Sequence, residues 1–426
     1  MLAKMYIAAI LLVALTTIFS PVRGIYCLVF LFLCSPSSIF AEEVERFRPI
    51  LLIGFLVFAR TFTSVFSTVT ARQFKFSFVM ALFVICAILS YALSGNIDFW
   101  RSVQIANYLK AGILSVVLVS FIKDKQALTT IIRIMVLGAA INGIFAVYEQ
   151  FNPIAKRLAE SPLLYRSSGF LENSNRFSAV ILSIFPFSFY TFIQAKSKWL
   201  RYFGLAAIAL SVIGVFCSVS RLGLLTLLVV MGLIALKQSK QIQTYIVLAV
   251  IVFGFLFFGA QLYRQRETVK ETRSGEIKFD ASTSMRINLI KTALSIWIRN
   301  PLFGVGPGNF VQQSMEQLDV RKREVSRSVH NAYLHLLAEQ GFLGFSLFVA
   351  LILMSLKAAS FLRQKTGEYK DLAGYFQISI LVWLFSFLAG TSQIDPIMYI
   401  CLTLPIILEK IYYLNEKAEA QFVRRA

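Results

Sequence analysis

Three side chains of this sequence combine a useful chemistry with an informative position, namely Arg221, Arg286 and His330. A guanidinium is a permanent cation whose planar fork of N–H donors matches phosphate oxygens. Neutral imidazole accepts a proton near neutral pH and is the most frequent general base of enzymes. Such residues could bind an anionic group and take part in proton transfer, provided that the fold brings them together.

Arg221 belongs to the motif Ser-Val-Ser-Arg-Leu-Gly at 218–223, which joins two apolar runs with almost no loop. The motif therefore belongs at a membrane boundary. Two interpretations remain open: an arginine that snorkels to the interface, or a cation held near a lipid head group.

Arg286 lies in the first turn of a predicted helix that reaches about Ile298, with Ser282 or Thr283 as N-cap and a stop at Asn300-Pro301. The free N–H groups of a first turn bind anions, although a solvated surface arginine is the alternative. Four apolar residues at helical spacing would lay this helix on the bilayer surface: Ile287, Ile290, Leu294 and Trp297.

His330 and His335 are the two histidines of the chain. His335 lies one turn from Asn331 and from Glu339, which predicts a structural hydrogen bond. His330, at the predicted start of a helix that re-enters the membrane, is the better catalytic candidate. The nearby glycines predict tight turns and not a nucleotide cradle, because no strand precedes them: Gly304, Gly306 and Gly308.

The elements that must position these residues are membrane helices. The chain is 57% hydrophobic and 15% charged, whereas soluble domains are about half apolar and a quarter charged. Runs of roughly 18 to 20 apolar residues recur without the period-2 alternation of a β-barrel. The five cysteines lie in or beside these runs, without disulfide or metal spacing. We predict an all-α fold, a polytopic membrane helix bundle of 12–13 transmembrane helices.

Thirteen candidate spans follow from the hydropathy: 5–20, 24–39, 49–69, 76–94, 108–122, 127–148, 176–194, 199–218, 221–236, 243–262, 336–356, 372–390 and 395–413. Either of the first two could be partial, so the side of the N-terminus stays open. One set of alternate loops holds fourteen basic and three acidic residues, and the other short loops hold six and eight. The positive-inside rule predicts that the first set and the C-terminus are cytoplasmic, and it accounts for the net charge of +20 without nucleic acid.

This sorting places the polar segment 263–336 outside, with twelve Lys or Arg and seven Asp or Glu. Long loops translocate regardless of charge, and an anionic ligand would explain the excess of positive charge. We therefore divide the chain into an N-terminal transmembrane bundle at 1–262, a large outer loop at 263–336, and C-terminal helices with a cytoplasmic tail at 337–426.

Secondary candidates for substrate binding are Arg60, Arg166, Arg176 and Tyr333. Arg60 is the only clear mid-span charge, and an intramembrane arginine is a functional hypothesis by default, with helix pairing as the alternative. Arg166 and Arg176 crowd one outer loop with polar neighbours that could line a cleft: Glu172, Asn173 and Asn175. For Tyr333 a packing role competes with a supporting role at the site.

Four stretches together resemble the O-antigen ligase and polymerase superfamily. They are the Ser-Arg-x-Gly turn at 220–223, the helix of Arg286, the Asn-Pro-x-x-Gly-x-Gly-x-x-x-Phe run at 300–310, and the His-Asn-x-Tyr-Leu…Glu-x-Gly-x-x-Gly ending at 330–344. The resemblance covers about 215–350. It does not separate ligases, polymerases and some protein O-oligosaccharyltransferases.

The resemblance implies an inverting GT-C glycosyltransferase that needs no metal or other cofactor. Its donor would be a glycan on undecaprenyl pyrophosphate at the outer, periplasmic face of the bacterial inner membrane. In a ligase the acceptor would be a sugar hydroxyl of lipid A–core, and in a polymerase a growing lipid-linked polysaccharide. By motif match, Arg221, Arg286 and His330 would be the essential residues. From their chemistry we expect the two arginines to bind the pyrophosphate, and His330 to accept the proton of the acceptor hydroxyl or to orient that hydroxyl.

We expect the ligase-type function, with the polymerase as the alternative. A lipid-linked glycan flippase is a distant alternative, because a flippase is expected to line a mid-membrane cavity with charge. In this sequence polarity gathers in one outer loop instead.

Overall fold

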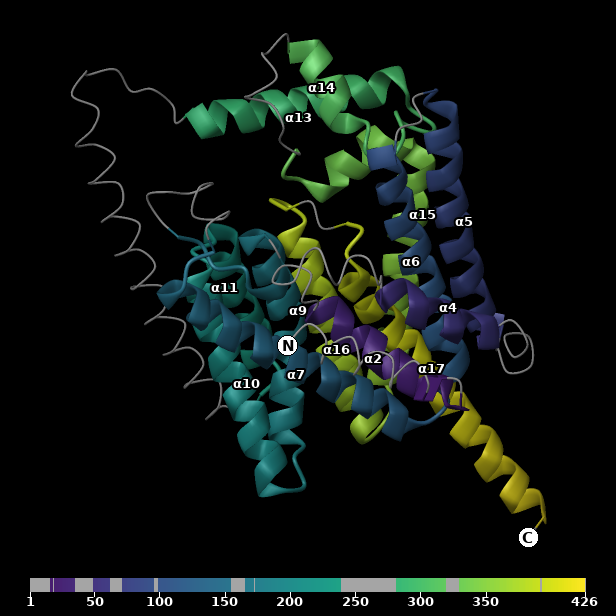
Figure 1. The fold of residues 1–426 in the computed structure, drawn as a ribbon. Helices are drawn as coiled ribbons and strands as arrows, with labels where there is room; N and C mark the ends of the chain where they lie inside the picture. Colours follow the sequence, from purple (N-terminus) through teal and green to yellow (C-terminus); the bar gives the residue numbers. More distant parts are fainter. Residues whose placement is uncertain are drawn as a thin grey trace.

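The structure is a computed structural model of the 426-residue chain. It describes residues 16–17, 19–34, 49–61, 71–95, 99–154, 165–171, 173–238, 281–318, 329–390 and 393–425. Every regular element within these ranges is a helix (Figure 1). The predicted all-α fold class is therefore confirmed.

The helices have these bounds: α2 Pro21–Leu33, α4 Pro49–Thr61, α5 Ala71–Leu93, α6 Phe99–Phe121, α7 Lys125–Phe151, the 3-10 turn η2 Gly169–Leu171, α9 Ser174–Ile193, α10 Lys198–Cys217, α11 Arg221–Ala235, α13 Ala281–Arg299, α14 Phe310–Leu318, α15 Ala332–Arg363, α16 Glu368–Ser386 and α17 Pro396–Arg425.

Within the described ranges, seven helices are long and apolar enough to cross a membrane, namely α5, α6, α7, α9, α10, α15 and α17. The apolar helices α2 and α11 are shorter. The chain is thus a multi-pass membrane protein, as predicted. The predicted span 243–262 and nearly all of 5–20 lie outside the described residues, so the total of twelve or thirteen crossings stays a prediction.

The core of the bundle sits around α9 and α17. In their most apolar windows, 78% of α9 and 83% of α17 is buried, against 33% of α5 and 28% of α10. The outer helices turn large apolar side chains away from the bundle, and on α5 these are Phe74, Phe78, Ile85 and Leu89. Apolar outer faces of this kind suit contact with hydrocarbon.

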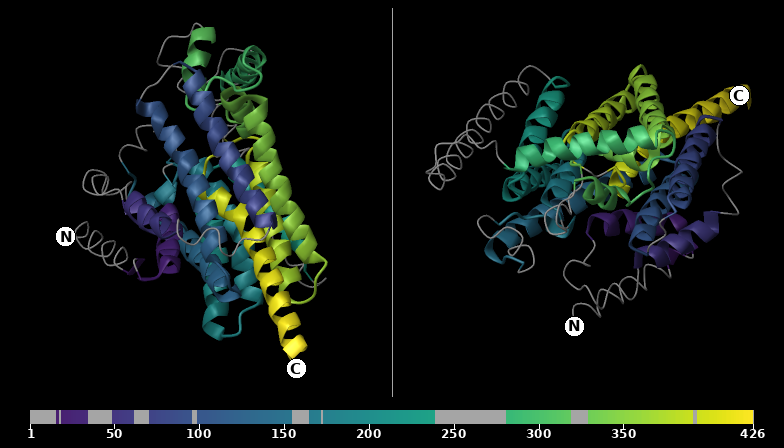
Figure 2. Two further views of the ribbon diagram at one scale, coloured as in Figure 1. Left: turned by 90° about the vertical axis from the view of Figure 1, so that its right-hand side faces the viewer. Right: turned by 90° about the horizontal axis from the view of Figure 1, so that it is seen from above.

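From α5 onward the long helices of the bundle run in alternating directions, with α13 lying across them, so their connections gather at two ends of the bundle (Figures 1 and 2). One end, the basic end, holds the loops 122–124, 194–197 and 364–367. The opposite end, the motif end, holds the turns 218–220, 300–309, 329–331 and 387–390. Basic residues gather at the first: Arg72, Lys75, Lys123, Lys125, Lys196, Lys198, Arg201, Lys237, Arg363 and Lys365. The loops that the charge sorting grouped together as basic thus lie at the same end of the bundle.

Charged residues also lie within helices near the basic end. Lys410 is fully buried in α17 and donates to the carbonyl of Val119, at 2.6 Å, near the C-terminus of α6. A cation there complements the unpaired carbonyls of the helix end. Its neighbour Glu409 pairs with Arg72. Both charges lie near the end of the predicted span 395–413, so the statement that Arg60 is the only clear mid-span charge stays a prediction.

Lys237 ties the end of α11 to the start of α16. Its ammonium donates to the carbonyl of Asp371 and lies 3.5 Å from the ring centroid of Tyr375. Burial lowers the pKa of Lys237 to about 8. The ammonium is thus partly shielded from water and joins these two helices at the basic end.

Helix α13 lies across the motif end, roughly at right angles to the long helices (Figures 1 and 2). One face packs into a cluster made of Leu289, Ala293, Ile296, Val305, Phe310, Val329 and Ala338. The other face exposes Ile287, Ile290, Leu294 and Ile298. This exposed apolar face is free to meet a bilayer surface, although that contact stays a prediction. The predicted N-cap, Ser282 or Thr283, is wrong, because the helix already includes Ala281. The prediction that Arg286 lies in the first turn is wrong for the same reason, because it is the sixth residue of α13.

The glycine-rich loop 300–309 docks into a break in α15. At Gly341, φ is +63° and ψ −166°, which frees backbone groups on both sides of the break. Val305 N donates to the carbonyl of Ala338 at 3.0 Å, and Phe342 N to that of Pro301 at 2.8 Å. Three loop glycines have positive φ, as the predicted tight turns require: Gly304, Gly306 and Gly308. The motif glycines therefore form the joint, the contact between the loop 300–309 and the break in α15, that holds α13 in place.

Gly341→Ala is expected to destabilise the protein more than Gly95→Ala. Both glycines have positive φ, +63° and +66°, where an alanine costs about 1–2 kcal/mol. A Cβ at Gly341 would in addition lie 2.4 Å from the backbone of Leu302, whereas a Cβ at Gly95 meets nothing within 4 Å. Thermal unfolding in detergent measures both variants. Equal shifts in Tm would show that the joint does not depend on close approach.

Candidate active site

Arg221 is the first residue of α11 and follows a strained turn. Val219 has φ +49°, a true outlier for a β-branched residue. Ser220 caps α11 by accepting from Gly223 N at 3.0 Å, and its hydroxyl donates to Asn175 Oδ1 at 2.8 Å. The side chain of Arg221 is exposed, and no described residue engages it in a hydrogen bond or ion pair. The turn thus presents a cation that is available to a ligand.

His330 lies two residues before α15 and has φ +53°. Among the described residues, His330 and Val219 are the two non-glycine residues with positive φ. Asn331 then caps α15 by accepting from Leu334 N at 3.0 Å. Strained backbone persists only where surrounding contacts enforce it, and it clusters at active sites. Both strained residues fall in motifs that the sequence had singled out for chemistry.

The segment 387–390, directly after α16, fixes the chain next to His330. Its carbonyls accept from Ala332 N at 2.9 Å and from Asn331 Nδ2 at 3.3 Å. Two bonds from consecutive residues leave the preceding backbone little freedom. They account for how the conformation of His330 is held.

The same segment comes near the start of α11. A Cβ at Gly390 would lie 3.8 Å from Leu222 Cδ2, so the residue after Arg221 lies beside the end of the segment. One four-residue stretch thus holds the turn of His330 and lies near Leu222, although 109 positions separate Arg221 from His330 in the sequence.

Helix α13 brings the backbone of Arg286 toward this region. Arg286 lies one turn before Leu289, which is buried in the same cluster as Val329, the neighbour of His330. The N-terminal end of α13 lies on the side of α11 in Figure 1, and its C-terminal end lies over α15. The side chain of Arg286 is outside the described residues, so its meeting with the other two stays a prediction.

Arg166 braces the Arg221 turn. Its Nη2 donates to Asn175 Oδ1 at 3.1 Å, and its Nε to the carbonyl of Ser218 at 3.4 Å. The same Asn175 oxygen accepts from Ser220. Arg166 thus holds this turn through two of its neighbours. A contact of Arg166 with substrate stays a prediction, and Glu172 lies outside the described residues.

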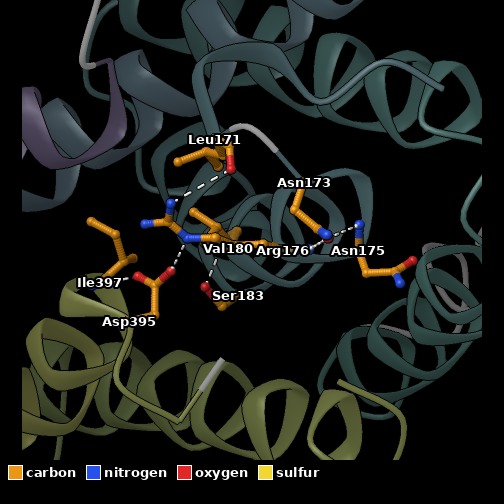
Figure 3. Close-up of polar contacts among 8 residues, drawn as sticks. All are labelled: Leu171, Asn173, Asn175, Arg176, Val180, Ser183, Asp395 and Ile397. Atoms are coloured by element: carbon orange, nitrogen blue, oxygen red, sulfur yellow. Dashed lines mark hydrogen bonds and ion pairs between the residues drawn. The ribbon is translucent and has the colours of Figure 1, made fainter. Parts of the chain in front are cut away.

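Arg176 joins the start of α9 to the loop before α17 (Figure 3). Its guanidinium lies between two acceptors, with Nε 2.6 Å from Asp395 Oδ2 and Nη1 3.5 Å from the carbonyl of Leu171. Asn173 caps α9 by accepting from Arg176 N at 3.1 Å. The side chain of Asp395 is 1% exposed and that of Arg176 35%. Such a pair is a structural clamp, and a substrate contact of Arg176 stays a prediction.

Arg176→Ala is expected to destabilise the protein more than Asp395→Ala. The first change leaves a buried carboxylate without its cation, which costs roughly 3 kcal/mol or more. The second leaves a guanidinium that still reaches solvent. Thermal unfolding of both variants and of the double variant measures the difference. If Asp395→Ala lowered Tm more than Arg176→Ala, the clamp would not act as the geometry indicates.

Tyr333 packs against the end of α16. Its hydroxyl donates to the carbonyl of Leu384 at 2.8 Å, and its ring meets that of Phe387 edge-on at 5.9 Å. These contacts support the docking of α15, and direct substrate binding by Tyr333 stays a prediction. Arg60 lies in the last turn of α4, and its side chain is outside the described residues.

Glu339 links the glycine-rich loop to α15. Its Oε1 accepts from Gly308 N at 2.9 Å and from Phe310 N at 3.4 Å, and it lies 3.0 Å from His335 Nε2. His335 Nδ1 lies 3.2 Å from Gln393 Nε2. His335 thus lies beside Glu339 and is hydrogen-bonded to Gln393, but the predicted hydrogen bond of its side chain to Asn331 or Glu339 is not formed, because Nε2 has no hydrogen-bond partner among the described residues.

The supporting roles of two carboxylates, Glu149 and Asp395, were not predicted from the sequence. Glu149 counted as a loop residue, but it is fully buried in α7 and accepts from Ser168 N at 2.9 Å and from Gly169 N at 3.1 Å. No sequence signal marks it, because a glutamate near a helix end usually faces water. Asp395 had a signal, since Asp-Pro often opens a helix, and its Oδ1 accepts from Ile397 N at 2.9 Å.

The family comparison follows this geometry. Residues 205–349 match the family model described as O-antigen ligase, a region that runs from α10 into α15 and includes Arg221, Arg286 and His330. Comparison with curated proteins finds no match. Within the described ranges, no group of three His, Cys, Asp or Glu could hold a metal ion. The family match confirms the resemblance of the motifs and identifies residues 205–349 as a domain of the O-antigen ligase and polymerase superfamily.

Proposed function

We propose that the protein is an O-antigen ligase-type glycosyltransferase that moves a glycan from undecaprenyl pyrophosphate to a sugar hydroxyl of lipid A–core. The family domain supports a ligase or polymerase-type function in a membrane. One observation supports the assignment to these residues: the segment 387–390 holds the turn of His330 and lies near Leu222, next to Arg221, and both motifs contain a residue with strained backbone.

In the proposed reaction the acceptor hydroxyl gives its proton to the imidazole of His330. The hydroxyl oxygen attacks the anomeric carbon of the donor sugar from the side opposite the pyrophosphate. The bond from that carbon to the pyrophosphate oxygen breaks, and undecaprenyl pyrophosphate leaves with the electron pair. The new glycosidic bond therefore has the inverted configuration.

The proposed role of Arg221 and Arg286 is to stabilise the charge that grows on the leaving pyrophosphate. Interactions stronger in the transition state than in the ground state raise the rate. A pair of unit charges about 4 Å apart is worth roughly 4 kcal/mol at an effective dielectric constant near 20, an upper guide. The planar fork of arginine suits phosphate oxygens better than the point charge of lysine.

In this proposal the motif end faces the periplasm and the basic end faces the cytoplasm of the inner membrane. The gathering of Lys and Arg at the basic end supports this orientation, because cytoplasmic loops carry an excess of both. The C-terminus, at the end of α17, then lies on the cytoplasmic side. The donor pyrophosphate and the acceptor would meet Arg221 and His330 at the outer face.

The experiment that tests the proposal offers one purified lipid-linked glycan donor to the protein with and without lipid A–core. Transfer to lipid A–core supports the ligase. Lengthening of the donor by itself supports the polymerase alternative, which uses the same residues with another acceptor. Absence of both products, with a positive control enzyme active on the same donor, would contradict the proposed reaction.

A further inference from the structure

A cavity of about 320 Å³ opens at the basic end, far from the candidate active site. It lies among the first turns of α7, the end of α9, the start of α10 and the start of α16, in the lower part of Figure 1. Its polar lining includes three basic side chains and one acidic side chain: Lys125, Arg133, Lys196 and Glu368. Apolar walls come from Ile132 and Leu200. The cavity thus combines a positively charged lining with apolar walls.

The one acid does not neutralise the lining. Glu368 pairs with Lys125, which leaves Arg133 and Lys196. Both of these side chains are exposed, and no described residue forms a hydrogen bond or ion pair with either. The carboxylate of Asp371 lies nearby, where it accepts from Gln194. Two cations that face one cavity and pair with no carboxylate among the described residues favour an anionic occupant.

The depth of Arg133 in the membrane limits which anions could occupy the cavity. Arg133 lies eight residues after Lys125 in α7, a rise of about 12 Å along the helix, and α7 is a candidate membrane span. An arginine exposed at that depth is costly beside hydrocarbon and needs water or an anion. A lipid phosphate can reach this position while its acyl chains stay among the apolar side chains.

The level of the cavity agrees with a lipid head group. Trp199 is 84% exposed and Tyr202 62% exposed in the first turns of α10, which also provides part of the wall. Exposed Trp and Tyr mark the membrane–water interface. The cavity mouth therefore lies at the height of the phosphates of the adjoining leaflet.

We propose that this cavity binds the phosphate-bearing head group of an anionic glycerophospholipid, with Arg133 and Lys196 as its ligands. Basic pockets between transmembrane helices recognise such head groups through charge and N–H donors. The site is independent of the glycan chemistry at the motif end. Occupancy of the cavity would then depend on the lipid composition of the leaflet next to the basic end.

The test offers the purified full-length protein an equal mixture of phosphatidylglycerol and phosphatidylcholine and counts retained lipids by native mass spectrometry. The variant is Arg133→Gln with Lys196→Gln. The matched control, Arg201→Gln with Lys198→Gln, removes the same residue types from α10 outside the cavity lining. The single variant Lys196→Gln, in an exposed loop, serves if the double variant does not fold.

We expect the wild type and the control to prefer phosphatidylglycerol, and the double variant to lose roughly tenfold in apparent affinity. The single variant Lys196→Gln should lose a smaller part of the affinity for phosphatidylglycerol. No preference in the wild type, or equal loss in the control, would overturn the proposal. A large excess of inorganic phosphate that raises Tm in lipid-free detergent as much as phosphatidylglycerol does would show a soluble-anion site and overturn the lipid assignment.

Discussion

Replacement of His330 by asparagine is expected to lower the rate of glycan transfer by roughly 10²- to 10⁴-fold, the range for a lost general base. Asparagine is the informative choice because it tolerates positive φ, as His330 requires at +53°. The backbone of the turn should therefore survive while the proton acceptor is lost. Initial rates of transfer with purified protein, together with Tm, measure the effect.

The control for this prediction is His335→Gln. His335 lies 3.0 Å from Glu339 and within a packed group that includes the ring of Phe310. Its loss should lower Tm more than the loss of His330 and should reduce the rate less. Full activity of His330→Asn would exclude His330 as the base. Equal behaviour of the two variants would indicate a structural role for both histidines.

Arg221→Ala is expected to lower the rate by about 10²- to 10³-fold, as for a lost group that stabilises transition-state charge. Because the side chain is exposed and no described residue engages it, Tm should hardly change. Arg221→Lys should recover part of the rate, since the charge remains while the planar fork is lost. The fall should appear mainly in kcat, because the interaction grows as the leaving group departs.

The matched control is Arg201→Ala, an equally exposed arginine in the first turns of α10 at the basic end. It should leave the transfer rate unchanged. Arg166→Ala forms an intermediate case, because Arg166 braces the turn through Asn175 and Ser218. A rate for Arg221→Ala equal to that of Arg201→Ala would remove Arg221 from the mechanism. A fall confined to KM would assign Arg221 to ground-state binding of the donor.

The helices were predictable because hydrocarbon imposes a simple rule of length and apolarity. The predicted span 127–148 falls inside α7, and the predicted span 199–218 ends one residue beyond α10. The ends were less regular, since helix starts depend on single capping residues: α13 includes Ala281, ahead of the expected cap. The partners of charges near the span ends were not predictable either, because Lys410 donates to the carbonyl of Val119, far away in the sequence.

The motif residues could be named from the sequence, whereas their supports could not. Side-chain type and position pointed to Arg221 and His330. Nothing local indicated that 387–390 would hold the turn of His330 and lie near Leu222, because this depends on how α11, α15 and α16 pack. The strain at Val219 was equally invisible, since the backbone of a valine in a short turn is decided by tertiary contacts.

The central claim is that this chain breaks the bond between a glycan and a lipid pyrophosphate at its motif end and joins the glycan to a hydroxyl acceptor. The most direct measurement follows free undecaprenyl pyrophosphate and glycosylated lipid A–core together, in proteoliposomes that contain the purified protein and the lipid-linked donor. We expect both to appear in equal amounts with the wild type, and both to form roughly 10²- to 10⁴-fold more slowly with His330→Asn. Movement of intact donor across the vesicle membrane, without bond cleavage, would contradict it.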